Sequence, residues 1–229
     1  MNKNRIILTV LSLIIVLGFS SFIYAQNDEN ELKSKFSNFG TISKKYMDLD
    51  SKDNTIAFTI NGEEITINKI NEKKELEQAL GKTNIKDSEV VKSIIKNKTL
   101  LQQAKKLGVT VSDEEAKNAS LHEKELLYDN HTSNEDREAV LEYIKSLGIS
   151  EDEYWNVYNV KQYKDFLAVN KLYEIVTKDA VIMKSDAINS SETLEIKKQY
   201  FAKYTEDLYN NAIIEYINAD LKLKIDKNE

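Results

Sequence analysis

The sequence contains no cysteine and no proline, and glycine occurs only six times in 229 residues. Without cysteine, the chain has no disulfides, no thiolate metal ligands and no thiol nucleophile. A chain of this length can bury an adequate core without disulfides, so it remains suited to export. Because proline and glycine interrupt regular structure, their scarcity favours long helices. A general bias toward Asn, Lys and Ile would produce the same counts, and this alternative stays open.

Arginine is also scarce, since Arg5 and Arg137 are the only two in the chain. The formal net charge is −6 at pH 7. A nucleic-acid-binding protein normally presents a basic, arginine-rich face. We therefore expect no nucleic-acid partner. An acidic balance of this kind suits a protein that has to stay soluble outside the cell.

The N-terminus has the layout of a secretory signal peptide. Met1–Arg5 is short and basic, Ile6–Phe19 is an apolar run, and small residues lead to Ala25 before the chain becomes polar. This order predicts export, with cleavage after Ala25. Ile23 is larger than the residue usually found at its position before a cleavage site. Retention of this region as a membrane anchor therefore stays open.

Residues 1–25 are accordingly expected to be a signal peptide or an N-terminal membrane anchor. An uncut helix over residues 6–24 is close to the roughly 20 residues that span a bilayer. The absence of cysteine excludes lipid attachment through an N-terminal cysteine. In either form the remaining chain is extracytoplasmic, either secreted or held in the cell envelope. We expect residues 26–54 to be a polar linker with room for one short helix, and residues 55–229 to be one domain.

Two β-branched runs, Thr55–Ile60 and Glu63–Ile67, flank Asn61-Gly62. This dipeptide is a strong hairpin signal because both residues tolerate positive φ. A two-stranded hairpin alone is marginally stable. We therefore predict that the β-rich segment Ala212–Ile217 pairs with it as a third strand.

The rest of the chain has helical periodicity with clear start and stop signals. Gly108 and Gly148 each follow a leucine and precede a restart at Ser112 or Ser150, the pattern of C-terminal caps and capping boxes. We expect mainly α structure with a small antiparallel sheet, an α+β class. The predicted helices cover residues 72–80, 87–107, 112–147 with a break at 129–136, 150–176 and 192–210, with a loop over Lys184–Ser191.

Motifs of common enzymes are absent from the sequence. It contains no glycine-rich phosphate loop, no His-Glu-x-x-His and no Gly-x-Ser-x-Gly. His131 and Asp129 could together contact a metal ion, but a solvated loop histidine is the preferred interpretation, and His122 is the only other histidine. We expect no catalytic residue, no metal and no cofactor.

Aromatic residues at helical spacing suggest a binding surface instead. Tyrosine and tryptophan suit peptide grooves because they bury area while keeping one polar atom hydrated. The alternative is that they form the ordinary core of a helical domain. We expect a mixture, with some in the core and the outer ones in a shallow groove. The candidates for polypeptide binding are Tyr154, Trp155, Tyr158, Tyr163, Phe166, Tyr200 and Tyr204.

Three stretches carry a resemblance to a known family. Asn61–Thr66 (NGEEIT), Leu100–Glu115 (LLQQAKKLGVTVSDEE) and Leu147–Trp155 (LGISEDEYW) follow one another in the expected order. Together they resemble the N-terminal chaperone domain of SurA- and PrsA-type foldases, over about residues 61–217. The resemblance implies a helical SurA N-terminal-like domain whose C-terminal helix and strand pack back on the N-terminal hairpin. It also implies an exported protein that holds unfolded polypeptides.

Many members of that group carry a parvulin prolyl isomerase domain ahead of the last helix. Here the corresponding gap, between Val176 and Glu192, is far too short for such a domain, and no histidine or glycine follows Gly148. The resemblance thus implies binding of unfolded or exported polypeptides through an apolar groove, without catalysis. Two alternatives stay open: an envelope interaction module with one dedicated partner, and, less favoured, an active isomerase. Self-association into a homodimer also stays open.

Overall fold

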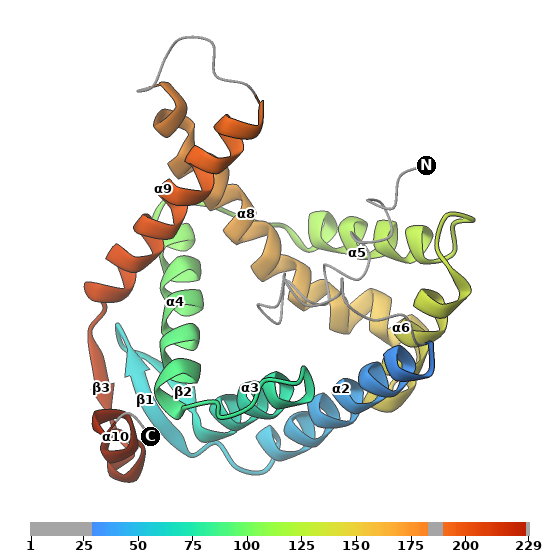
Figure 1. Cartoon of the computed structure of the whole chain (residues 1–229), viewed down its shortest axis with the longest axis horizontal. Coiled ribbons are helices and arrows are strands. Elements are labelled where there is room, and N and C mark those ends of the chain that lie inside the picture. Colours follow the sequence, from blue (N-terminus) through green and yellow to red (C-terminus); the bar gives the residue numbers. More distant parts are fainter. Residues whose placement is uncertain (1–28, 183–189, 228–229) are drawn as a thin grey trace.

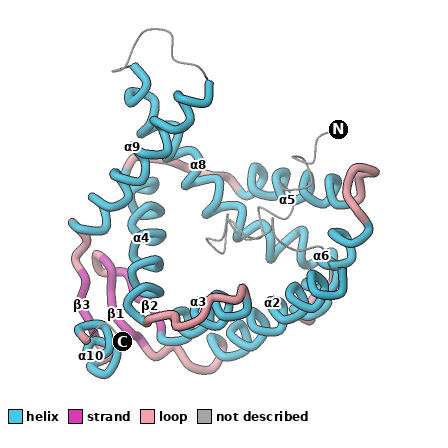
Figure 2. Tube along the Cα trace, in the orientation of Figure 1, coloured by secondary structure: helices cyan, strands magenta, loops and turns pink. Residues whose placement is uncertain are grey.

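The computed structural model describes residues 29–182 and 190–227. The predicted leader over residues 1–25 and most of the predicted loop Lys184–Ser191 lie outside these ranges, and Ser190 already belongs to a helix. The elements (Figures 1 and 2) are α2 (Glu29–Asp50), β1 (Ile56–Ile60), β2 (Glu63–Thr66), α3 (Ile67–Ala79), α4 (Asp87–Lys106), α5 (Asp113–Leu127), α6 (Asn134–Leu147), α7 (Glu151–Glu153), the π-helix η2 (Tyr154–Tyr158), α8 (Asn159–Ile182), α9 (Ser190–Asn210), β3 (Ile214–Tyr216) and α10 (Ala219–Asp226).

The predicted fold class is confirmed: most of the described residues are helical, and the strands form one small three-stranded sheet of order β2-β1-β3. Both pairings are antiparallel, and Asn61 and Gly62 have φ values of 50° and 84°, as a tight turn with positive φ requires. The third strand lies within the predicted segment and pairs with β1, so Phe58 faces Tyr216 across the ladder. The C-terminal strand therefore returns to the N-terminal hairpin as expected.

The expected linker is wrong over residues 29–50, because this segment forms the 22-residue helix α2. Phe36, Phe39 and Tyr46 lie on one stripe of the helix and are buried. They pack against α6, and the contact is so close that a Cβ on Gly40 would lie 2.5 Å from the Tyr143 carbonyl oxygen. The stripe is sparse and the opposite face is polar. The helix that covers the stripe, α6, begins about 100 residues later in the chain. Residues 29–50 taken alone therefore resemble a linker.

The predicted helix signals are confirmed by the backbone geometry. Ser112 Oγ accepts a hydrogen bond from the Glu115 amide at 3.0 Å, and Ser150 Oγ accepts one from the Glu153 amide at 3.1 Å. Gly108 and Gly148 have φ values of 72° and 73°, the left-handed conformation of a helix C-terminus. Helix α3 begins five residues earlier than predicted, because Thr66 Oγ1 caps it.

The segment that starts at Ser150 is longer and less regular than predicted. It runs to Ile182 and contains the π-helix η2 near its start. Within η2 the Asn159 amide bonds to the Tyr154 carbonyl, and the Trp155 carbonyl accepts a hydrogen bond from Ser120 Oγ at 2.7 Å. Helix α10 was not predicted, and its buried Leu221 packs against the sheet.

Three apolar clusters hold these elements together. One joins α2, α6 and η2, a second joins the sheet, α4 and α10, and a smaller third joins α4, α8 and α9. Figure 1 shows α2 and α3 along the base, α4 rising at one side, and α8 passing from α9 to α6. In this view the helices and the sheet are arranged as a ring.

Candidate functional site

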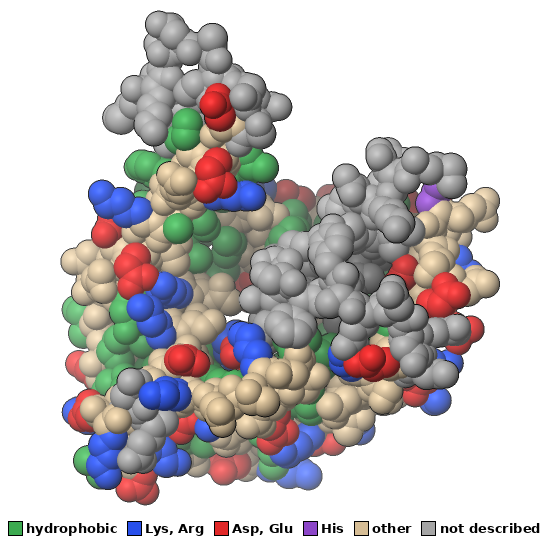
Figure 3. All heavy atoms as spheres, viewed as in Figure 1, with side chains coloured by type: hydrophobic (Ala, Val, Ile, Leu, Met, Phe, Trp, Pro, Cys, Tyr) green, Lys and Arg blue, Asp and Glu red, His purple; other side chains and the backbone are tan. Residues whose placement is uncertain are grey.

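A cavity of about 410 Å³ lies between α3, α4, η2 and α8, with single contributions from α2, α6 and β2. We call it the central cavity. In Figure 3 hydrophobic side chains are visible beside α4 in the hollow that faces α8. Its apolar and aromatic lining consists of Ile65, Leu76, Ile94, Leu101, Tyr143, Tyr154, Tyr158, Phe166 and Val169.

The π-helix supplies the aromatic part of this lining. Tyr154 and Tyr158 stack with ring centroids 5.6 Å apart, and the Tyr143 and Tyr158 hydroxyls lie 3.3 Å apart. Trp155 is fully buried with its ring centroid 4.8 Å from that of Tyr154, and its Nε1 donates to Glu151 at 3.2 Å. π turns of this kind often occur at functional sites. Here the turn places two tyrosines at the cavity and buries a tryptophan next to one of them.

A buried polar network anchors the π-helix. Asn159 Nδ2 donates to Ser120 Oγ at 3.1 Å and to Glu123 Oε2 at 3.0 Å. All three side chains are buried. Because buried polar groups are costly unless they are hydrogen-bonded, this network favours a single position of η2 against α5.

The tyrosine hydroxyls of the cavity remain neutral well into the alkaline range. Burial raises the pKa of Tyr143 and Tyr154 well above 10, and burial also raises the pKa of Tyr158. A neutral hydroxyl can donate or accept a hydrogen bond without introducing charge. This part of the wall therefore combines apolar area with uncharged polar atoms.

The lysines at the cavity are each paired with a carboxylate. Lys69 lies 2.7 Å from Glu72, and Lys98 lies 2.6 Å from Glu63. Desolvation is the largest single effect on Lys69 and acts to lower its pKa, but the attraction and hydrogen bond of Glu72, together with Tyr158 and Asp50, raise the pKa overall. Lys73, which is 3.7 Å from Glu77, has a lowered pKa because it is desolvated.

Besides the hydrogen-bonded Asn159, three amide side chains line the cavity: Asn97 from α4, and Gln162 and Asn170 from α8. Within residues 29–182 and 190–227, none of the three takes part in a side-chain hydrogen bond. An amide side chain offers both donors and an acceptor, as a peptide backbone does. These groups can therefore bind the main chain of an extended polypeptide.

The structure separates the seven predicted aromatic candidates. Tyr154, Tyr158 and Phe166 line the central cavity, although Tyr154 is only 1% exposed, whereas Trp155 is in the core. Tyr163 contacts Phe166 edge-on but is not part of the lining. Two candidates lie on α9, away from the cavity: Tyr200, which is 45% exposed, and Tyr204, which packs in the third cluster.

Sequence reasoning missed the residues that α3, α4 and α6 contribute. Tyr143, Asn97 and Lys69 come from helices that meet only in the tertiary structure. A signal for Tyr143 was present, because it shares a helical stripe with Ala139 and Leu147. For Asn97 and Lys69 the sequence contains no comparable pattern.

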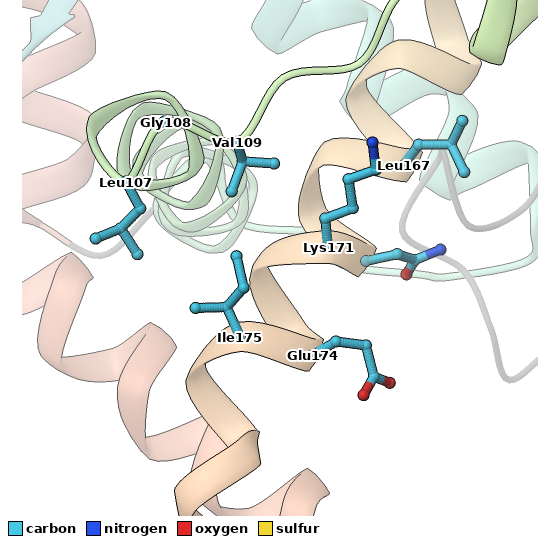
Figure 4. A pocket seen from close by; sticks show the side chains of 8 residues that line it. Leu107, Gly108, Val109, Leu167, Lys171, Glu174 and Ile175 are labelled. Atoms are coloured by element: carbon cyan, nitrogen blue, oxygen red, sulfur yellow. The ribbon is translucent and has the colours of Figure 1, made fainter.

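A second, more open hollow of about 470 Å³ lies between the end of α4 and the middle of α8. We call it the outer hollow. In Figure 4 Leu107, Val109 and Ile175 point toward one another and Glu174 points away. Leu107 and Ile175 are 47% and 51% exposed. Asn170 belongs to the lining of both hollows, so the two apolar surfaces are adjacent along α8.

The two histidines lie away from both hollows. His131 is on the turn between α5 and α6, where its side chain is 76% exposed and contacts Asp129. His122 is on α5 with its side chain 68% exposed. The position of His131 fits the solvated loop histidine expected from the sequence.

No helix within the described ranges combines the length and the apolarity needed to cross a membrane. The predicted leader, residues 1–25, lies outside the residues searched.

Comparison with known proteins agrees with the resemblance seen in the sequence. A family model described as the SurA-like N-terminal domain matches residues 1–144. The glutamate-rich protein GrpA of Alkalihalophilus pseudofirmus is 33% identical over 90 residues, which cover 38% of this chain and 57% of that protein. The match thus spans little more than half of the relative's length. No solved structure matches the chain.

Proposed function

From the premise that this chain belongs to the SurA-like N-terminal domain family, a chaperone-like family of foldases, we propose that it binds non-native, exported polypeptides in the central cavity without catalysis. The observation that carries this proposal is the lining of the cavity. Apolar side chains, neutral tyrosines and three amides that form no side-chain hydrogen bond with the described residues face one concave space. Such a surface can bind many sequences, because it contacts apolar side chains and the main chain rather than particular residues.

The proposed mechanism is holding with rapid release. Burying one apolar side chain contributes about 1.5–3 kcal/mol. A cavity of about 410 Å³ accommodates few side chains, so affinity for any one segment is modest. Modest affinity allows the polypeptide to dissociate and fold without an energy source. Conversely, tight binding would trap it.

Proteins of this family are periplasmic or extracytoplasmic. We propose that residues 1–25 direct export of this chain, as a cleaved signal peptide or as an anchor over residues 6–24. N-terminal sequencing of the protein from its native cell distinguishes the two, since a cleaved form begins at Gln26. A chain that retains Met1 and stays in the cytoplasm would contradict export.

The outer hollow favours a second candidate, an envelope interaction module that grips one dedicated folded partner or a second copy of the chain. Leu107 and Ile175 are half exposed there, and such a surface is better suited to a fixed partner than to varied segments. Replacing Ile175 with serine separates the candidates. Loss of a specific envelope partner with holding retained would favour the module.

The test of the main proposal is suppression of aggregation of an unrelated unfolding protein. Tyr158→Ser and Phe166→Ser should weaken suppression while helix content is retained, because both residues line the cavity and neither is fully buried. Tyr200→Ser is the matched control, since Tyr200 is exposed on α9. Equal suppression by all three variants and the parent protein would contradict binding in the central cavity.

The proposed absence of catalysis has its own test. Rotation about an X–Pro bond has a barrier of about 18–20 kcal/mol, and an isomerase must stabilise the twisted amide. We expect the purified protein to leave the slow, proline-limited phase of a model protein's refolding unchanged. A reproducible acceleration of that phase would contradict the non-catalytic proposal.

A further inference from the structure

Among the described residues, two carboxylates line the central cavity: Glu72, which is paired with Lys69, and Asp165, which differs from it. Asp165 lies on α8 and lines the cavity together with Gln162, Phe166 and Val169. Gln162, Asp165 and Val169 are three or four positions apart, so they form one stripe along the helix, and Phe166 is next to Asp165 in the chain. Asp165 is therefore presented beside the apolar surface that a bound segment would contact.

Within the part of the chain that the structure describes, Asp165 forms no hydrogen bond and no ion pair. The neighbouring charges are already paired, Lys69 with Glu72 at 2.7 Å and Lys98 with Glu63 at 2.6 Å. Each of these pairs is neutral as a unit. Beside these two pairs, the Asp165 carboxylate has no partner of its own among the described residues.

The surroundings of Asp165 also weaken its hydration. Its side chain is exposed, but the concave walls partly desolvate it. This desolvation raises the pKa of Asp165, while Lys98 and Lys69 act in the opposite direction. A carboxylate that is partly desolvated and unpaired is stabilised when a cation approaches it.

We propose that Asp165 gives the central cavity a preference for apolar polypeptide segments that carry a lysine or arginine next to the apolar residues. The apolar side chains of the segment would pack on Phe166, Val169 and Leu101, and its ammonium or guanidinium group would pair with Asp165. This inference rests on the proposed polypeptide binding and adds to it a preference for certain segments. An acidic segment would be repelled by Asp165. The nearby Lys69 and Lys98 would attract it only weakly, because each is already paired with a carboxylate.

The experiment uses three labelled peptides of one apolar, extended sequence that differ at a single position, which is lysine, glutamine or glutamate. Fluorescence anisotropy gives the affinity of each for the parent protein. We expect the lysine peptide to bind about threefold more tightly than the glutamine peptide, the size of a partly exposed ion pair. The glutamate peptide should bind most weakly.

Three variants assign the effect to Asp165. Asp165→Asn should make the lysine and glutamine peptides bind equally. Asp165→Lys should reverse the order, so that the glutamate peptide binds most tightly. Asp207→Asn is the matched control, because Asp207 is exposed on α9 and does not line the cavity. It carries the same change of charge and should retain the preference for lysine.

The outcomes separate this inference from the proposed function. Equal binding of the three peptides to the parent protein, or a lysine preference that persists in Asp165→Asn, would overturn the role of Asp165 while leaving polypeptide binding intact. Failure of all three peptides to bind would overturn the proposed function itself. Circular dichroism of each variant confirms that the helices remain folded.

Discussion

The region around η2 and the outer face of α9 both carry aromatic residues at helical spacing, but they expose them very differently. Tyr154 and Trp155 are 1% and 0% exposed, whereas Tyr200 is 45% exposed. Helices α2, α5 and α6 and the buried network of Asn159 surround η2. Within the described residues, helix α9 packs mainly along α4 and α8, and Tyr200 lies on a side of it that stays in solvent. The number of packed neighbours, not the residue type, decides whether an aromatic side chain is core.

The largest expected effect is on the η2 side of this comparison. Trp155→Ala should lower the free energy of unfolding by about 3–5 kcal/mol, because it leaves a large cavity in a fully packed core. Urea unfolding followed by circular dichroism measures the change. Because Trp155 is the only tryptophan, circular dichroism rather than fluorescence has to be the probe. A loss below about 1 kcal/mol would show that the η2 core is loosely packed.

A somewhat smaller effect tests whether α2 belongs to the same core. Gly40→Ala should destabilise the protein by about 1–3 kcal/mol, since the new Cβ would meet the Tyr143 carbonyl oxygen at 2.5 Å and Ser146 Cβ at 2.7 Å. The loss is expected even though alanine favours a helix more than glycine does. Asn38→Ala is the control, because Asn38 is exposed on the same helix. If both variants were equally stable, α2 would not be packed closely on α6.

Alkaline pH should affect the η2 side selectively. Burial raises the pKa of Tyr143 and Tyr154 well above 10, while in the unfolded chain both titrate near 10. The folded state therefore binds these protons more tightly. Their contribution to stability is complete below pH 10 and is lost as the pH rises through the folded-state pKa values.

Absorbance at 295 nm and urea midpoints, recorded together above pH 9, check this expectation. Tyr143→Phe and Tyr154→Phe should reduce the loss of stability with rising pH, and Tyr200→Phe should not. Early titration of every tyrosine in a protein that remains folded would be inconsistent with the burial described.

The smallest effect is expected on α9. Tyr200→Ser should change the free energy of unfolding by no more than about 0.5 kcal/mol, as for most surface substitutions. The same urea titration measures it. A loss comparable to that of Trp155→Ala would mean that α9 is covered in solution, for example by a second copy of the chain.

Local signals accounted for much of the fold. Asn61-Gly62 predicted the hairpin, and Ser112 and Ser150 predicted helix starts, because each depends on a few neighbouring residues. The pairing of the third strand followed from the instability of an isolated hairpin, and it is confirmed. The role of α2 did not follow, because its buried stripe is defined by contact with α6.

The candidate site could be predicted only in part. Phe166 and Tyr158 were identified because aromatic residues are conspicuous in a helical pattern. Asp165 was not, because one acidic residue on a charged helix face has no distinguishing local feature. Its distinction is that it has no partner among the residues the structure describes, and this depends on the pairing of Lys69 with Glu72 and of Lys98 with Glu63.

The sequence by itself determined the helical class, the hairpin, the positions of most helix ends and the family resemblance, because caps, turns and periodicity act over a few residues. The tertiary structure alone decided which aromatic residues are core, that α2 is part of the fold, and that α3, α4 and α8 enclose a cavity. Burial and charge pairing are properties of residues brought together from distant parts of the chain. No local sequence pattern predicts this burial or this charge pairing.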